Sequence, residues 1–130
     1  MTDPAQAANE YLKNKIKTAS KEQLVLMLYD GAIALAKQAK VHLVGKQWDV
    51  AHTTLIRAQN ILLELIYALD REKGGAVAEN LYSLYNYCYT RLVEANVHHA
   101  PEKIDECLSI MNTLREAWAT AMEEAKKCKS

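Results

Sequence analysis

The stretch Leu69–Asn96 reads LDREKGGAVAENLYSLYNYCYTRLVEAN, and the arrangement of the rest of the chain depends on it. Its first seven residues form a charged segment that ends in Gly74-Gly75, a pair that predicts a turn. The residues from 76 to 96 have the apolar spacing of a helix. This predicted helix carries four of the seven tyrosines in the chain, which are Tyr82, Tyr85, Tyr87 and Tyr89.

The helix over 76–96 has two apolar stripes, whereas a helix in a bundle needs only one, about 100° wide. The stripe predicted to face the core consists of Val77, Leu81, Leu84, Cys88, Leu92 and Ala95. The second stripe is centred roughly 100° away by the helical period, and it consists of Ala78, Tyr82, Tyr85, Tyr89 and Val93. The second stripe is apolar surface beyond what one core contact requires.

Three further helices are predicted around this one. A capping box, in which Ser20 and Gln23 satisfy each other's backbone groups, starts a helix that runs to about Val44. Gly45 ends that helix, and the next covers about 48–70. The last helix begins at Pro101, where the missing N–H does no harm, and runs to about Lys127.

These helices predict an all-α fold, an antiparallel up-down-up-down four-helix bundle, because short connections force neighbouring helices to run antiparallel. Residues 20–130 are expected to form this single domain. Residues 1–19 are polar and are expected to form a flexible N-terminal arm, with Tyr11 and Ile16 among its few large apolar side chains.

The helix over 48–70 also has surplus apolar residues, since Ile56, Leu63 and Tyr67 recur at helical spacing outside its core stripe. Two consecutive helices with second stripes suggest a groove that binds an amphipathic or extended partner segment. Two alternatives stay open. The tyrosines can flank the bundle core with their hydroxyl groups in water, or the stripe can be a dimer interface of a self-associating structural bundle.

The composition excludes several other classes of protein. The 16 basic and 16 acidic residues balance and the pI is about 6.9, which argues against a protein built to bind nucleic acid. The three cysteines form neither a disulfide framework nor a zinc motif. The N-terminal region does not resemble a signal peptide, and no apolar run has the ~20 residues of a membrane span. We therefore expect a cytoplasmic protein without membrane insertion.

The sequence offers no candidate catalytic residues, cofactor or metal ligands. The four histidines have no acidic partners at ligand spacing, and no Glu-x-x-His motif is present. Gly74-Gly75 follows a helix rather than a strand, so it is a turn and not a phosphate-binding loop. A non-enzymatic function is therefore expected.

Two motifs in the chain resemble those of the flagellar secretion chaperone (FliS) family. Residues 18–32 read TASKEQLVLMLYDGA, similar to the family pattern TASPEQLIxMLYDGA with Lys21 in place of proline. Residues 69–96 resemble the pattern LDxEKGGxxAxNLxxLYxY followed by RLxxAN. Residues 115–118 resemble the late Ala-Trp element of the family. The resemblance covers essentially the whole chain in order.

This resemblance implies a bundle that binds the disordered C-terminal region of flagellin on apolar surface grooves. It also implies that the chaperone prevents premature polymerisation and aids delivery to the flagellar type III secretion apparatus. Components of that apparatus and a co-chaperone are further candidate partners. In the family, a tyrosine of the N-terminal arm folds over part of the client site, and Tyr11 is the matching residue here, with Ile16 nearby.

Overall fold

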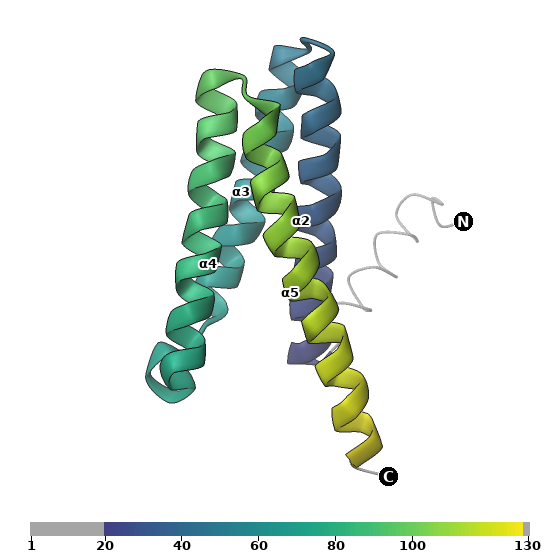
Figure 1. Cartoon of the computed structure of the whole chain (residues 1–130), viewed down its shortest axis with the longest axis vertical. Coiled ribbons are helices and arrows are strands. Elements are labelled where there is room, and N and C mark those ends of the chain that lie inside the picture. Colours follow the sequence, from purple (N-terminus) through teal and green to yellow (C-terminus); the bar gives the residue numbers. More distant parts are fainter. Residues whose placement is uncertain (1–19, 129–130) are drawn as a thin grey trace, which may run out of the picture.

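The computed structural model describes residues 20–128, and these form four long helices and no strand. The helices are α2 (Lys21–Val44), α3 (Trp48–Ala68), α4 (Arg71–His98) and α5 (Pro101–Cys128). Each helix contacts the next one along the chain, and α5 returns to contact α2. The arrangement is the predicted antiparallel up-down-up-down bundle, which confirms the all-α fold class (Figure 1). The expected flexible arm, residues 1–19, lies outside the described residues.

Local signals account for most helix ends. The Ser20 hydroxyl accepts from Gln23 N at 3.2 Å, and the Gln23 side chain accepts from Ser20 N at 3.1 Å, so the capping box is confirmed. The α2 helix ends at Val44 as predicted. In the turn that follows, Lys46 rather than Gly45 adopts the left-handed conformation.

The start of α4 differs from the prediction, because the charged segment before the glycines is helical and not an open turn. Asp70 is the N-cap and its carboxylate accepts from Lys73 N at 3.0 Å, so α4 starts at Arg71. The helix is broken once inside, at Gly75, which has φ +58° and ψ −137°. Only glycine adopts this conformation without strain, so the first turn of α4 is set at an angle to the rest of the helix.

Small residues let the helices pack closely. The buried core contains many alanines between larger side chains, namely Ala32, Ala36, Ala39, Ala51, Ala58 and Ala95. A Cβ atom placed on Gly31 of α2 would lie 3.2 Å from Ile61 Cδ1 of α3, tighter than an ordinary van der Waals contact. The absence of a side chain at Gly31 therefore permits the α2–α3 approach.

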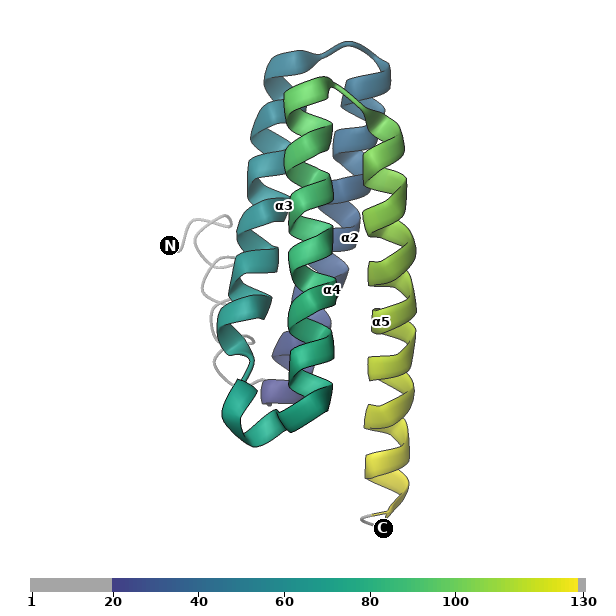
Figure 2. The same ribbon diagram turned by 60° about the vertical axis from the view of Figure 1, so that its left-hand side comes forward.

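The helices α4 and α5 diverge toward the start of α4 and the end of α5 (Figures 1 and 2). This divergence corrects the predicted core stripe of α4. Val77 and Leu84, which were expected to face the core, are 69% and 36% exposed. Because α5 diverges from the start of α4, it leaves that part of α4 less covered. No described helix has both the length and the apolar character that crossing a bilayer requires.

Candidate functional site

Five apolar residues from the two predicted second stripes lie on one side of the α3–α4 pair. We call this set the α3–α4 stripe, and it consists of Ile56, Leu63, Tyr82, Tyr89 and Val93. The Asn96 amide nitrogen donates to His52 Nδ1 at 2.8 Å and joins the two helices on that side. By the 3.6-residue period, Ile56 and Leu63 share a helix face with His52, and Tyr82, Tyr89 and Val93 share one with Asn96.

The side chains of the α3–α4 stripe are only partly covered by the bundle. Ile56 is 38% exposed, and the other four are partly exposed. Partly exposed apolar groups in one continuous row can be covered further by a partner. The stripe offers partly exposed apolar surface, and its role in binding stays a prediction.

Tyr82 is held by a charged pair from the start of α4. The Arg71 guanidinium lies 3.9 Å from the centre of the Tyr82 ring. The same guanidinium donates two hydrogen bonds to the Glu79 carboxylate, at 2.8 and 3.0 Å, and these bonds lower the pKa of Glu79. One face of the Tyr82 ring is therefore occupied by Arg71, and the side chain is partly exposed.

The predicted division of α4 into a core stripe and a second stripe is wrong for Tyr85 and Ala78. Both were placed on the second stripe, and both are buried. Tyr85 is 2% exposed, and its hydroxyl lies 2.5 Å from the hydroxyl of Tyr29 on α2. Burial raises the pKa of both tyrosines. The ring of Tyr29 also packs edge-on against Trp118 of α5, with 6.1 Å between ring centres. Tyr85 therefore belongs to the contact between α2, α4 and α5.

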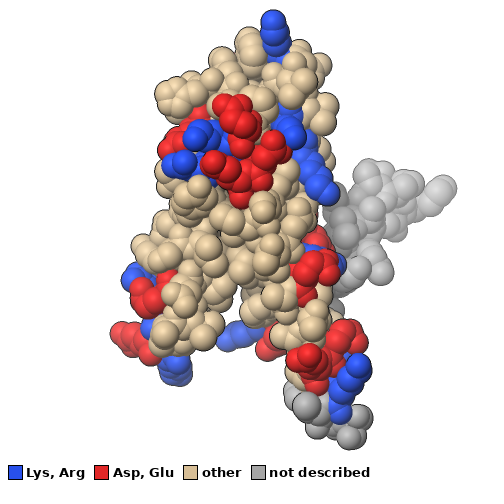
Figure 3. Space-filling model, in the orientation of Figure 1, with Lys and Arg blue, Asp and Glu red and all other residues tan. Residues whose placement is uncertain are grey.

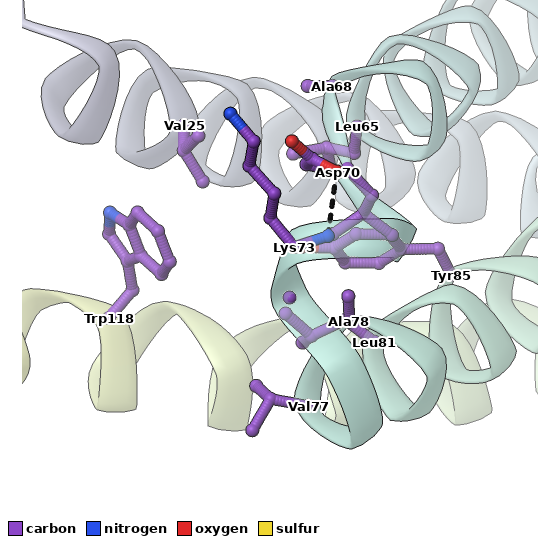
Figure 4. Close-up of a pocket in the computed structure, with 12 residues that line it drawn as sticks. Val25, Leu65, Ala68, Asp70, Lys73, Val77, Ala78, Leu81, Tyr85 and Trp118 are labelled. Carbon is purple, nitrogen blue, oxygen red and sulfur yellow. Dashed lines mark hydrogen bonds between the residues drawn. The ribbon is translucent and has the colours of Figure 1, made fainter.

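A cavity of about 390 Å³ opens where α4 and α5 diverge, and we call it the open-end cavity. All four described helices contribute to its wall, which is mostly apolar (Figure 4). Figure 3 shows the molecule hollowed between the ends of these two helices, with charged residues mainly near the other end and on the helix tips. The lining residues are Val25, Leu65, Ala68, Leu69, Asp70, Lys73, Gly74, Val77, Ala78, Leu81, Tyr85 and Trp118.

Tyr67, which was assigned to the same predicted stripe as Ile56 and Leu63, also borders residues at the start of α2. It is 79% exposed and lines a hollow of about 570 Å³ between the start of α2 and the end of α3. Val25 and Ala68 line both this hollow and the open-end cavity, so the two are neighbours. Apolar surface thus continues around the end of the bundle at which α2 starts.

Some of the site could not be found from the sequence. Val77 and Leu81 were assigned to the bundle core, yet both line the open-end cavity, together with Trp118. No signal in the sequence separates these roles, since an apolar side chain that faces a cavity has the same spacing as one that faces a helix. Tyr11 and Ile16 lie outside the described residues, so their place at a client site stays a prediction.

The described residues include exposed apolar surface and no cluster of metal ligands. Within residues 20–128, no three His, Cys, Asp or Glu side chains gather in a way that could hold a metal ion. The buried thiols of Cys88 and Cys107 lie together, and the Cys88 thiol donates to the Cys107 carbonyl oxygen at 3.9 Å. The hydrogen bond with Cys88 and burial raise the pKa of Cys107, which makes it a poor nucleophile.

Comparisons with known proteins agree with the sequence motifs. A crystal structure of a flagellar chaperone from bacteria has the same fold, with a TM-score of 0.76 and 19% identity over 94% of this chain and 99% of that one. The chain is 36% identical over 110 residues to the flagellar secretion chaperone FliS of Salmonella typhimurium, which covers 82% of this chain and 80% of that protein.

A second relative is the flagellar secretion chaperone FliS of Bacillus subtilis, with 30% identity over 117 residues, 90% of this chain and 86% of that protein. The family described as flagellar protein FliS matches residues 4–125. This match spans nearly the whole chain and includes both sequence motifs. The chain therefore belongs to the FliS family of flagellar secretion chaperones.

Proposed function

We propose that this protein is a cytoplasmic export chaperone that binds the disordered C-terminal region of flagellin. The bound client cannot polymerise early and is delivered to the flagellar type III secretion apparatus. Family membership supports the chaperone role, since the relatives are named flagellar secretion chaperones. The observation that carries the choice of surface is the α3–α4 stripe, a row of partly exposed apolar side chains along two helices.

The physical logic of the proposal is coupled folding and binding. A disordered client segment loses conformational entropy when it is ordered, so it must bury a large apolar area to bind. A stripe that spans five residues on two helices provides an extended contact rather than a single pocket. Binding of this kind requires apolar contact and no catalytic group, which agrees with a chaperone that is not an enzyme.

Circular dichroism tests the proposal directly. A synthetic peptide with the C-terminal sequence of flagellin is expected to gain helix when it is mixed with this protein, so the spectrum of the mixture should exceed the sum of the separate spectra. A peptide of the same composition in scrambled order is the control. A mixture spectrum equal to the sum for both peptides would reject the proposal.

Light scattering separates the chaperone from a self-associating bundle that uses the same stripe. The chaperone is expected to be a monomer whose mass does not change with concentration. A dimer that dissociates on dilution and loses its peptide binding on dimerisation would favour the self-associating bundle.

A further inference from the structure

The mouth of the open-end cavity carries the Lys73 ammonium group, which has no ion-pair partner among residues 20–128, beside the carboxylate of Asp70. Among the described residues that line it, Asp70 and Lys73 are the charged ones. The Asp70 carboxylate caps α4 by accepting from Lys73 N. Among residues 20–128, no carboxylate lies within ion-pair distance of the Lys73 ammonium group, whereas Arg71 two residues earlier is paired with Glu79. Figure 4 shows the Lys73 side chain extended along the cavity mouth toward Val25.

The interior of the open-end cavity suits an apolar side chain and does not suit a passing main chain. The buried side chains of Leu65 and Tyr85 close it on the core side. Its volume of about 390 Å³ is within the range of small-ligand sites, roughly 300–1,000 Å³. A peptide that ran through it would bring backbone N–H and C=O groups into an apolar wall without partners, which is costly.

We propose that the open-end cavity receives the extreme C-terminal end of the client. An apolar side chain near that end fills the cavity, and the terminal carboxylate binds the Lys73 ammonium at the mouth. The C-terminal end of a peptide can place an apolar side chain beside a carboxylate, and no backbone continues beyond it into the cavity. This inference rests on the proposed function, because the client it names is the C-terminal region of flagellin.

The experiment is a cycle of two peptides and two proteins, measured by titration calorimetry. The peptides have the same flagellin C-terminal sequence, one with a free terminal carboxylate and the other with a terminal amide. The proteins are the unchanged chain and Lys73→Met, which keeps the length of the side chain and removes its charge. Amidation is expected to weaken binding to the unchanged chain by about tenfold, since a charge-assisted bond is lost. Lys73→Met should bind both peptides equally and more weakly.

A matched control removes a lysine elsewhere. Lys37 is exposed on α2, and Lys37→Met is expected to keep the full difference between the two peptides. Trp118 lines the cavity, so its fluorescence gives a second readout. A Trp48→Phe background leaves Trp118 as the only tryptophan. In this background, the Trp118 emission should shift more on binding the peptide with a free terminal carboxylate than on binding the peptide with a terminal amide.

The outcomes separate this inference from the proposed function. Equal binding of both peptides to the unchanged chain would overturn the inference and leave the proposed function intact. A difference that persists in Lys73→Met, or disappears in Lys37→Met, would also overturn it. Absence of binding for both peptides would reject the proposed function, and this inference with it.

Discussion

Tyr29 and Tyr85 join α2 to α4 through a hydrogen bond between their hydroxyl groups, which lie 2.5 Å apart in the core. The two rings are tilted by 55° with 6.2 Å between their centres, and Trp118 packs edge-on against Tyr29. The indole nitrogen of Trp118 donates to the Glu22 carbonyl oxygen at 2.8 Å. These three aromatic residues therefore connect α2, α4 and α5 next to the open-end cavity.

Removal of both hydroxyl groups should cost less than the sum of the two single removals. Tyr85→Phe leaves the buried Tyr29 hydroxyl without its partner, so the free energy of unfolding should fall by about 1–3 kcal/mol. The double variant Tyr29→Phe/Tyr85→Phe has no unpaired hydroxyl and should lose less than the sum of the two single variants. Urea unfolding of the four proteins measures this difference. Strictly additive losses would contradict a shared hydrogen bond.

The same pair should make stability depend on alkaline pH. Burial raises the pKa of Tyr29 and Tyr85 above the ordinary value, so both keep their protons in the folded chain when tyrosines of the unfolded chain release theirs. Stability from this source is complete below about pH 10 and falls as pH rises further. Urea unfolding at increasing pH should show a smaller decline for Tyr29→Phe/Tyr85→Phe. Equal declines would contradict the assignment.

Tyr85 also shows what a helical wheel cannot decide. Tyr82 and Tyr89 belong to the same predicted stripe as Tyr85, and both are partly exposed whereas Tyr85 is buried. Adjacent positions of a stripe differ in angle by a few tens of degrees. Whether a residue at the edge of a stripe is buried depends on how neighbouring helices approach, and Tyr29 and Trp118 supply that contact from distant parts of the sequence.

At the scale of the helix, the first turn of α4 is built around two glycines with different roles. Gly75 has a positive φ that only glycine adopts readily. A Cβ atom on Gly74 would lie 2.5 Å from Ala78 Cβ, closer than two carbon atoms can approach. Asp70 caps this turn and Arg71 reaches over Tyr82, so the turn forms one wall of the open-end cavity and one side of the stripe.

Gly75→Ala should destabilise the protein by about 1–2 kcal/mol, because an L residue at that φ brings its Cβ too close to the following carbonyl oxygen. Gly45→Ala is the control. Gly45 follows α2 with an ordinary φ of −80°, and a Cβ there meets nothing closer than 3.4 Å. Thermal unfolding followed by circular dichroism compares the two. A loss at Gly45 as large as that at Gly75 would show that the left-handed conformation is not responsible.

The ends of helices could be predicted where residues close in the sequence determine them. The buried face of a helix could be predicted only where the neighbouring helices stay parallel to it. Ser20 with Gln23, and Pro101, act within a few residues, and both mark the start of a helix as expected. The start of α4 was misplaced because Gly74-Gly75 is equally suited to a turn and to a kink inside a helix. Val77 and Leu84 were assigned to the core because nothing near them in the sequence encodes the divergence of α5.

At the scale of the molecule, the bundle is closed at one end and open at the other. The turns between α2 and α3 and between α4 and α5 lie at the closed end, where Trp48 stacks on His99 with 4.1 Å between ring centres. The open end brings together the open-end cavity and the hollow beside Tyr67. The α3–α4 stripe runs along the bundle between these ends, so a client bound along the stripe has further apolar surface at the open end.

The most direct test of the account is the affinity of a flagellin C-terminal peptide for Ile56→Asp, measured by calorimetry beside the control Val41→Asp. Ile56 and Val41 are both β-branched apolar residues, and their exposed fractions are 38% and 67%. Val41 lies on α2, away from the α3–α4 stripe. Circular dichroism should show both variants folded. Binding to Ile56→Asp should be at least about tenfold weaker, since a charge is buried against the client, and binding to Val41→Asp should be unchanged. Unchanged affinity in folded Ile56→Asp, or equal loss in both variants, would contradict the claim that the client binds the α3–α4 stripe.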